Sequence, residues 1–303
     1  MQACISLVIP TYNRLWALAS VLRQFYNEPF IGEIVVVDDG SMDDTKVWLG
    51  QEAAAQPKLI PIFHSSNKGA SAARNTGLGA ARYDYIMFWD DDLLLYPQNG
   101  IRILFEELQS HNGDVIAPAF YGRDEHSIPP LCGPKSASPN LLLNKMLLMR
   151  RSSEKVIKLS PKCTFQSNVL TSSMLLRRQI LEGLSYDEGL GLTSFRDETD
   201  IQLSILGRGG KLLACPQVWG LDLKRPLNQD GGCRSQGVLL NYELLACRNN
   251  WRMLKRHRKT IHKVLAVRYP IYVLQFIFVL YRLGYYLPRK IIGQFLRKTG
   301  LRK

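Results

Sequence analysis

The first 120 residues alternate between short apolar runs and amphipathic stretches, with brief polar connections between them. Apolar runs of this kind predict buried strands, and amphipathic stretches predict helices. The predicted strands are Cys4–Ile9, Ile31–Val37, Leu59–Phe63, Tyr85–Trp89 and Asp114–Pro118. The predicted helices are about Leu15–Tyr26, Asp44–Ala55, Ala70–Ala81 and Gly100–Ser110. Repeated strand–helix units predict an α/β fold with a parallel sheet, in which ligands bind beyond the carboxyl ends of the strands.

The regular pattern breaks up between Tyr121 and Pro161, where Pro, Ser and Gly are frequent. This stretch is too long for an ordinary connection, so we expect a mobile loop or an insertion that faces an acceptor. Further strands are predicted near Val169–Leu176, Lys211–Leu213 and Val218–Leu221. Further helices are predicted from Arg177 to Leu184, from about Asp197 to Gly207 and over Asn241–His257. The polar segment Lys224–Gly237 is rich in glycine and is expected to be flexible.

Positive charge is concentrated at the end of the chain. The 303 residues carry a formal net charge of +13, but residues 251–303 contain 14 Lys and Arg and no Asp or Glu. The remaining residues are almost neutral, so the charge describes a local surface and says nothing about the substrate of the body. The six cysteines are scattered without CxxC spacing, which argues against a zinc site or a disulfide scaffold.

An uncharged apolar run, Tyr269–Tyr281, lies within this basic region. Spanning a bilayer takes about 20 apolar residues, so this run is short. The segment suits a helix packed on the body or, as we favour, an anchor on an anionic membrane surface. We expect no nucleic-acid partner, because no recognised reading module accompanies the charge. Met1 leads almost directly into the first strand without a signal segment, so we expect a cytoplasmic protein, peripheral on the inner face of the cell membrane.

Three consecutive carboxylates, Asp90, Asp91 and Asp92, follow the strand that ends at Trp89. Adjacent carboxylates repel each other unless a cation lies among them. On an extended segment Asp90 and Asp92 point to the same side and suit one divalent metal ion, while Asp91 faces elsewhere. A solvated acidic turn would also explain these residues when they are taken alone.

A second polar turn, Asp38–Ser41, follows the strand Ile31–Val37. Backbone amides at such a junction offer a place for phosphates, and Asp38 or Asp39 has the acceptors for a nucleobase imide or a ribose hydroxyl. An ordinary Asp-Gly turn with Ser41 capping the next helix is the alternative. No GxGxxG follows either early strand and no GxxxxGK[ST] is present, which lowers the prospect of a dinucleotide-binding oxidoreductase or a P-loop protein.

Two further segments carry candidate chemistry. In Asn67–Gly77, the side chains of Asn67, Lys68 and Arg74 are expected near the strand ends, where an anionic ligand would bind. In Phe195–Asp200, carboxylates occupy a predicted first helical turn, where they suit the helix dipole but also supply a candidate general base.

These motifs occur together in an order and spacing that resembles the family 2 glycosyltransferases, the inverting nucleotide-sugar enzymes of GT-A fold. The matching segments, between about residues 4 and 256, are Pro10–Arg14, Val35–Ser41, Asn67–Gly77, Phe88–Leu93 and Arg196–Leu212. The resemblance implies a GT-A catalytic domain over 1–250, with a nucleotide-sugar half of about 1–120 and an acceptor half of about 121–250, followed by a basic extension over 251–303.

The family also implies a nucleotide-diphosphate-sugar donor and a divalent metal, Mn or Mg, bound through a DxD motif, here Asp90 and Asp92. The nucleoside would lie near Thr11, Tyr12, Asn13, Asp39 and Arg74, and the full set of donor-binding candidates is Pro10, Thr11, Tyr12, Asn13, Arg14, Asp38, Asp39, Asn67, Lys68, Gly69, Arg74, Asp90, Asp91 and Arg234. Arg234 belongs to Gln229–Ser235, which either closes over the diphosphate or is only a flexible surface loop.

The resemblance implies Glu198 as the catalytic base, with Asp197 as its neighbour, although this chain has Asp-Glu where many members have Glu-Asp. The family tends to place a metal-binding His shortly after the Pro that ends a later strand. Counting from Pro216 puts Asp222 at that position, so either Asp222 replaces the His or the metal has fewer protein ligands.

The expected function is the inverting transfer of a sugar from a nucleotide-diphosphate sugar to a hydroxyl of a glycan or lipid-linked acceptor, in cell-surface polysaccharide or glycolipid synthesis. The alternatives are a catalytically silent member that binds nucleotides or glycans and a sugar nucleotidyltransferase, which would release pyrophosphate.

Overall fold

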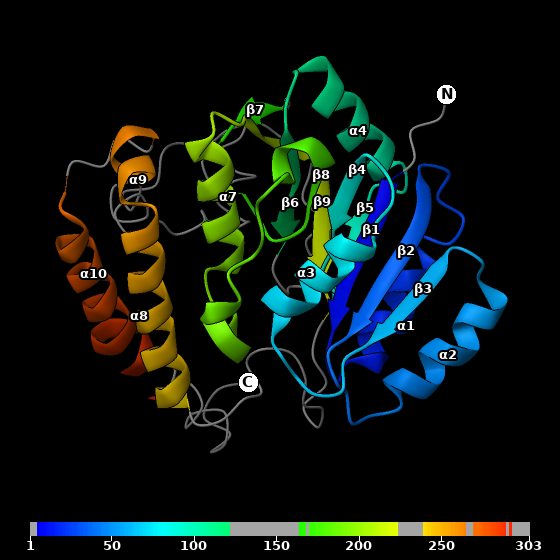
Figure 1. The fold of residues 1–303 in the computed structure, drawn as a ribbon, viewed down its shortest axis with the longest axis horizontal. Helices are drawn as coiled ribbons and strands as arrows, with labels where there is room; N and C mark the ends of the chain where they lie inside the picture. Colours follow the sequence, from blue (N-terminus) through cyan, green and yellow to red (C-terminus); the bar gives the residue numbers. More distant parts are fainter. Residues whose placement is uncertain are drawn as a thin grey trace.

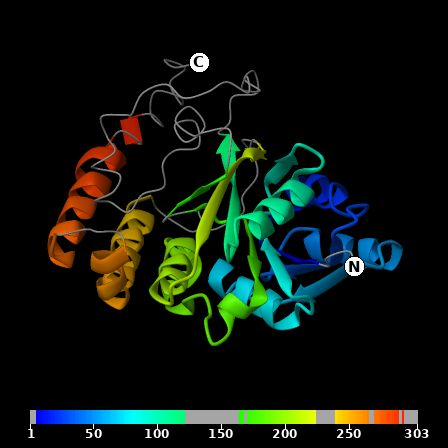
Figure 2. The same ribbon diagram turned by 90° about the horizontal axis from the view of Figure 1, so that it is seen from above.

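The computed structural model describes residues 5–121, 164–167, 170–223, 239–264, 269–288 and 291–292. One nine-stranded sheet forms its centre, with helices on both faces (Figures 1 and 2). The strands are β1 (Ile5–Thr11), β2 (Ile31–Asp38), β3 (Leu59–Phe63), β4 (Tyr85–Phe88), β5 (Leu93–Tyr96), β6 (Val115–Tyr121), β7 (Phe165–Gln166), β8 (Met174–Arg177) and β9 (Leu212–Asp222). Their order in the sheet is β3-β2-β1-β4-β8-β6-β9-β5, and β7 pairs with β9.

The sheet is parallel in the part that the first half of the chain builds. β3, β2, β1 and β4 are parallel, as the strand–helix pattern predicts. β8 then lies antiparallel between β4 and β6, and β5 and β7 lie antiparallel against β9. The predicted α/β class is confirmed, and the sheet as a whole is mixed.

Side chains of the central strands alternate between two hydrophobic layers, as the two-residue period of a strand requires. Leu7 and Ile9 of β1 belong to the layer under the helices α1 (Leu15–Arg23) and α4 (Gly100–Ser110). Val8 belongs to the opposite layer, which also contains residues of α3, α7, α8, α9 and α10. The remaining helices are α2 (Thr45–Ala55), α3 (Ala70–Ala80), α7 (Asp197–Gly207), α8 (Leu239–Arg256), α9 (Arg258–Val264), α10 (Ile271–Val279), the π-helix η3 (Leu280–Tyr286) and the 3₁₀ helices η1 (Arg178–Leu181) and η2 (Glu188–Thr193).

Several boundaries differ from the sequence predictions. The two strands predicted around Pro216 form one strand, β9, and the helix predicted from Arg177 to Leu184 is only the short 3₁₀ helix η1. The short strand β5 was not predicted at all. The predicted loop after Tyr121, the start of the strand predicted at Val169 and the segment Lys224–Gly237 lie outside the described residues.

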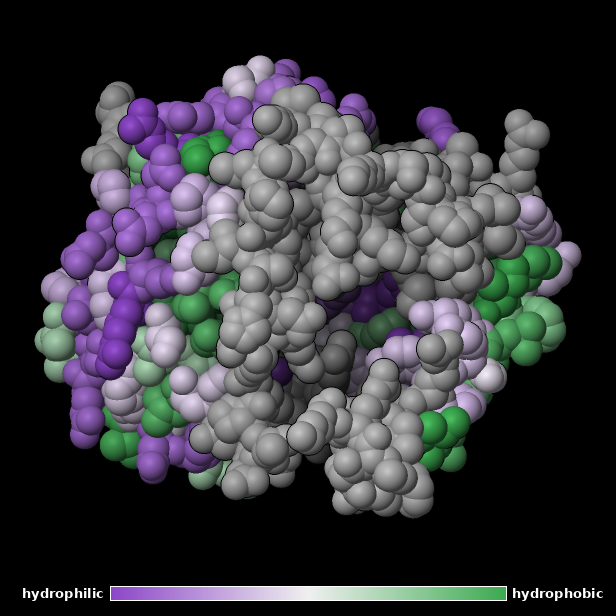
Figure 3. All heavy atoms as spheres, turned by 180° about the vertical axis from the view of Figure 1, so that it is seen from behind, coloured by the Kyte–Doolittle hydropathy of each residue, from purple (hydrophilic) through white to green (hydrophobic). Residues whose placement is uncertain are grey.

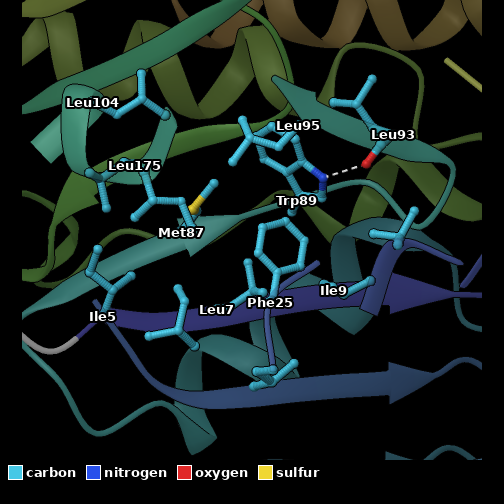
Figure 4. Packing of buried hydrophobic residues seen from close by; sticks show 14 of the residues in the cluster. Ile5, Leu7, Ile9, Phe25, Met87, Trp89, Leu93, Leu95, Leu104 and Leu175 are labelled. Carbon is cyan, nitrogen blue, oxygen red and sulfur yellow. Dashed lines mark hydrogen bonds between the residues drawn. The ribbon is translucent and has the colours of Figure 1, made fainter. Parts of the chain in front are cut away.

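The end of β4 is held rigidly by Trp89, the residue that directly follows the strand. Trp89 is buried and packs edge-on against Phe25, with ring centroids 6.0 Å apart (Figure 4). Its indole Nε1 donates a 2.7 Å hydrogen bond to the carbonyl of Leu93, the first residue of β5 (Figure 4). A buried Trp whose N–H is hydrogen-bonded has little conformational freedom. The position of Trp89 therefore fixes where the turn between β4 and β5 begins.

The strand order reverses beside β1. The chain runs from β1 outward to β2 and β3, and then returns to the other side of β1 with β4. Such a switch point leaves a crevice at the carboxyl ends of the two diverging strands, where α/β proteins bind ligands. The ends of β1 and β4 carry Thr11–Arg14 and Asp90–Asp92, so the fold brings these two motifs together.

Glu33, on β2, lies near the amino ends of β1 and β2, at the opposite edge of the sheet from the polar turns. Its buried carboxylate accepts hydrogen bonds of 2.6 Å from Ser6 Oγ and 2.6 Å from the amide of Arg82, and one of 2.7 Å from Arg82 Nε. Burial raises the pKa of Glu33, but these hydrogen bonds outweigh burial, so the pKa lies below its ordinary value. The Arg82 side chain is 69% exposed, so its ion pair contributes little by itself.

We expect Glu33→Gln to lower the free energy of unfolding at pH 7 by about 1–3 kcal/mol, because a charged acceptor for three donors is lost. A carboxyl whose folded pKa is depressed stabilises the fold above its unfolded pKa of about 4.3 and loses this effect as the pH falls through the folded pKa. Urea unfolding at pH 7 and at pH 3.5 measures this difference. Equal destabilisation at both pH values would contradict the role of the charge.

Candidate active site

The turn that follows Trp89 presents its carboxylates in a different way from the sequence prediction. Asp91 and Asp92 lie in a tight turn between β4 and β5, so the alternation expected of an extended segment does not apply. Asp91 is buried and accepts 2.7 Å hydrogen bonds from Thr11 Oγ1 and from Arg14 Nη1. The same Nη1 lies 2.8 Å from Asp92 Oδ2. Arg14 therefore joins the end of β1 to two of the three aspartates.

Arg74, on α3, joins the third aspartate to the predicted catalytic pair. Its guanidinium is buried and donates to Asp90 Oδ1 at 3.0 Å through Nη2 and to Asp197 Oδ2 through Nη1. It also lies over the ring of the buried Tyr186. Burial opposes the charge on Arg74, but Asp197 and Asp90 attract it strongly enough to raise its pKa further, so the guanidinium is charged.

Asp197 and Glu198 begin α7 and differ in their accessibility. Asp197 is buried against Arg74 and accepts a 2.7 Å hydrogen bond from the amide of Glu198. Burial raises the pKa of Asp197, and Arg74 opposes this rise. Glu198 is only partly buried. Of the two carboxylates, Glu198 is therefore the more accessible, while Asp197 is buried against Arg74.

The turn after β2 is organised by Asp39, whose carboxylate already has several protein partners. Its oxygens accept hydrogen bonds from the amides of Lys68 at 2.9 Å and Gly69 at 2.7 Å, and His64 Nδ1 lies 2.7 Å away. Gly69 has φ +94°, and a Cβ there would lie 2.7 Å from the carbonyl oxygen of Gly191. Only glycine suits this position. The hydrogen bonds from Lys68 and Gly69 to Asp39 hold the loop before α3 in a fixed shape.

The first two strand-end turns are also fastened to each other. The Asn13 amide donates to Ser41 Oγ at 2.8 Å, and the Met42 amide donates to the Asn13 side chain at 2.7 Å. Asp38 is buried and accepts a 3.0 Å hydrogen bond from the Ser41 amide, while burial raises its pKa. Ser41 thus binds the neighbouring turn and does not act as the predicted cap, since α2 begins without a side-chain cap.

The predicted metal ligands lie near one another but do not form a complete cage. Asp90 and Asp92 side chains are each 29% exposed. Asp222 lies opposite Leu93 in the β5–β9 pair, and its charge acts on Asp92. Burial, together with Asp91, Asp90 and Asp222, raises the pKa of Asp92 to about 7 against the effect of Arg14. Part of this rise comes from the neighbouring carboxylates, whose repulsion a bound cation would reduce.

These residues fit Mg or Mn if a ligand completes the site. Carboxylate oxygens are the donors that both ions prefer, and Mg commonly binds through one or two carboxylates together with substrate phosphates. Within the described part of the chain, no group of three or more His, Cys, Asp or Glu side chains has an arrangement that holds a metal by itself. A Mg or Mn ion at Asp90 and Asp92 would therefore need further oxygen ligands besides these carboxylates.

The other predicted donor-binding residues lie around the same strand ends. Pro10 is in β1, opposite Val37 of β2. Tyr12 and Asn67 are partly buried, and Lys68 is exposed. Arg234 and its loop lie outside the described residues.

Three residues of the site were not predicted from the sequence. Ser172 donates to Asp90 Oδ2 at 2.6 Å, His64 supports Asp39, and Tyr186 lies beneath Arg74. Ser172 and Tyr186 are far from the aspartates in the sequence and carry no motif. His64 directly follows β3, at the same edge of the sheet as the predicted motifs, and this position was the available signal.

Comparison with known proteins agrees with this geometry. Residues 6–155 match the model of the family described as Glycosyl transferase family 2. Glycosyltransferase GlyG of Streptococcus pneumoniae is 32% identical over 133 residues, which are 41% of this chain and 42% of that protein. The chain thus spans less than half the length of this curated relative.

Two solved structures have the same fold at low sequence identity. TarS residues 1–349 from S. aureus, in complex with UDP-GlcNAc, gives a TM-score of 0.58 at 16% identity, covering 92% of this chain and 72% of that chain. GalNAc-T7 with UDP, GalNAc and Mn²⁺ gives 0.63 at 16% identity, covering 90% of this chain and 54% of that chain. The fold is that of the GT-A glycosyltransferases. Through the matched residues, the chain belongs to glycosyl transferase family 2.

Proposed function

We propose that this protein transfers a sugar from a nucleotide-diphosphate sugar to a hydroxyl group of a glycan or lipid-linked acceptor, with inversion at the anomeric carbon. The observation that carries this proposal is Arg74, which contacts Asp90 of the aspartate turn and Asp197 at the start of α7. In this proposal Asp90 lies beside the departing diphosphate, and Asp197 is the neighbour of the base Glu198. The guanidinium of Arg74 connects these two carboxylates. We further propose a role in cell-surface polysaccharide or glycolipid synthesis.

Glu198 is the base in this proposal. Its partly exposed carboxylate takes the proton from the acceptor hydroxyl as the oxygen attacks the anomeric carbon from the face opposite the diphosphate. The bond from the anomeric carbon to the diphosphate oxygen breaks as the new glycosidic bond forms, which inverts the centre. Asp197, held by Arg74, fixes the backbone of Glu198 through its hydrogen bond to the Glu198 amide. General base catalysis of this kind contributes ~10²- to 10⁴-fold.

Asp90 and Asp92 would hold Mg or Mn together with the diphosphate, and Asp222 is a further candidate ligand. The metal, when bound, supplies Lewis-acid stabilisation of the charge that develops on the leaving diphosphate. The nucleoside would lie against the turns of Thr11–Asn13 and Asp39, which are already fixed before a donor arrives. Support for such a donor comes from TarS and GalNAc-T7, whose structures contain UDP-GlcNAc and UDP with Mn²⁺.

A screen of nucleotide sugars tests the proposal. At a concentration of 100 times Kd, a donor should stabilise the fold by about 2.7 kcal/mol and raise Tm by several degrees when Mn²⁺ or Mg²⁺ is present. Chelation of the metal should remove most of this shift. Product analysis then separates the alternatives: a nucleoside diphosphate indicates sugar transfer, pyrophosphate indicates a nucleotidyltransferase, and binding without turnover indicates a silent member.

We also propose that the C-terminal extension contacts an anionic membrane surface from the cytoplasmic side. Phe276 and Tyr272 on α10 are 62% and 66% exposed, and Leu280 and Tyr285 of η3 are also exposed. Figure 3 shows apolar surface gathered at the right edge of that view, where α10 lies. Among the described residues, no helix is long and apolar enough to cross a membrane. An exposed aromatic face within a region that has 14 basic and no acidic residues suits the surface of anionic lipid.

Vesicle sedimentation checks this surface. The full chain should bind vesicles of mixed phosphatidylglycerol and phosphatidylcholine, and the double substitution Phe276→Ser with Leu280→Ser should weaken binding at least about tenfold, because two apolar side chains no longer enter the interface. Met42→Ser, at another exposed apolar residue, is the matched control. Equal binding by the double variant would rule out this face.

A further inference from the structure

The segment that leads into Asp197 and Glu198 has an unfavourable backbone. Ser194 has φ 42° and Arg196 has φ 81°, so two residues with side chains adopt the left-handed region within three positions. Such a conformation is unfavourable for a residue with a side chain and persists only where its surroundings hold it. The position of the acidic pair at the start of α7 therefore depends on whatever holds Phe195 and Arg196.

The inner face of α10 and η3 supplies these contacts. Phe195 packs against Phe278 of α10, with ring centroids 5.9 Å apart. The guanidinium of Arg282, in η3, lies 5.0 Å from the Phe195 ring centroid. Arg196 lies 5.2 Å from the Phe278 ring centroid, and its Nε donates to Asn250 of α8 at 3.0 Å. Phe278 and Arg282 thus pack directly against Phe195 and Arg196, the two residues before the acidic pair.

The elements α10 and η3 are in turn fixed to α8. Arg282 forms an ion pair with Glu243 of α8 at 2.5 Å, and both side chains are buried. Gln275 of α10 accepts a 2.8 Å hydrogen bond from Asn250 and donates one of 2.9 Å to the carbonyl of Cys247. The two hydrogen bonds of Gln275 and the buried ion pair of Arg282 thus join α10 and η3 to α8. The last described helices of the chain are therefore connected rigidly to the residues just before Glu198.

We propose that Phe278 and Arg282 are positioning residues for the acidic pair, so that the C-terminal extension is part of the catalytic unit as well as the carrier of a membrane-facing surface. The catalytic consequence rests on the proposed function of Glu198. The structural claim is that these two side chains hold the backbone of residues 194–198, and it is independent of the proposed function. A displacement of about 1 Å of a reacting group can cost on the order of 10²-fold in rate.

Hydrogen exchange of the full chain tests the structural claim without any assay of activity. Phe278→Ala and Arg282→Lys should raise the exchange rate of amides in 194–200 by on the order of tenfold, because the aromatic contact or the planar guanidinium is lost. Leu274→Ala is the matched control, since Leu274 is equally buried on α10 but belongs to the large core cluster. Exchange that rises equally in the Leu274 variant, or that stays unchanged in both test variants, overturns the proposal.

A kinetic experiment tests the catalytic consequence. It measures hydrolysis of the nucleotide sugar, in which water replaces the acceptor. Phe278→Ala and Arg282→Lys should lower kcat by about 10- to 100-fold with KM for the donor within about twofold, whereas Leu274→Ala should keep the wild-type kcat at temperatures where all variants are folded. A raised KM with unchanged kcat would overturn the positioning role. If the wild type shows no hydrolysis, hydrogen exchange alone decides whether these residues hold the segment, and the nucleotide-sugar screen separately decides the proposed function.

Discussion

Glu198→Gln is expected to lower the rate of sugar transfer by ~10²- to 10⁴-fold while the affinity for the nucleotide sugar stays within about twofold. Gln has nearly the same shape but cannot take the proton of the acceptor hydroxyl. In the proposed function the donor binds at the strand-end turns and Arg74, and Glu198→Gln replaces none of these residues. Release of the nucleoside diphosphate measures turnover, and calorimetric titration of the donor in the presence of metal measures affinity.

Glu106→Gln is the matched control, because Glu106 is an exposed glutamate on α4 whose only described partner is Arg102 on the same helix. It should leave both quantities unchanged. Asp197→Asn is a less direct probe of the base, since Asp197 pairs with buried Arg74 and its loss also disturbs the fold. Transfer at the wild-type rate by the Glu198 variant would remove Glu198 as the base and return the role to Asp197 or to another group.

The parts of the fold that the sequence predicts well are those with local signals. Helix α4 and strand β3 have the predicted bounds because an amphipathic or apolar run is bounded by clear turn residues. β5 has only four residues directly after the aspartate turn, and its partner β9 lies more than 100 residues further along the chain. A short strand whose pairing is so distant carries no local pattern, and the same holds for the antiparallel position of β8 between β4 and β6.

In the candidate site, too, the residues with local signals were predicted and their distant partners were not. The rule that ligands bind at the carboxyl ends of parallel strands selects Thr11, Asp39 and Asp90, because each follows an apolar run. The choice of partners among them is not local. Arg14 is shared between Asp91 and Asp92. The sequence prediction assumed that side chains alternate along an extended chain, but the structure has a turn at these residues, so this sharing could not be predicted.

For the C-terminal segment the sequence favours a membrane-surface anchor over a helix packed on the body, and α10 has one buried face and one exposed face. Leu274 and Phe278 are buried, while Tyr272 and Phe276 are exposed. Hydrophobicity alone does not distinguish these faces, because the run is apolar on all sides. A truncation after His257 would remove Phe278 and Arg282 together with the outer face, so substitutions on one face at a time are the better experiments.

Asp92→Ala is expected to remove the metal-dependent part of donor binding, a loss on the order of 10²-fold or more. Asp92 is the better choice of the two predicted ligands. Asp90 also binds Arg74 and Ser172, so its removal would disturb the acidic pair as well. Donor titrations with Mn²⁺ and with a chelator, on the wild type and the variant, give the metal-dependent part as a ratio of two Kd values.

Asp84→Ala is the matched control, since Asp84 is an exposed aspartate just before β4, at the opposite end of the strand from Asp90, Asp91 and Asp92. The metal alone should bind weakly to both the wild type and the control, because the described carboxylates form no complete cage and the diphosphate must supply further oxygens. A ratio that remains large in the Asp92 variant would mean that Asp92 is not a ligand. Asp90 and Asp222 would then be the carboxylates to test, with Arg14 neutralising Asp92.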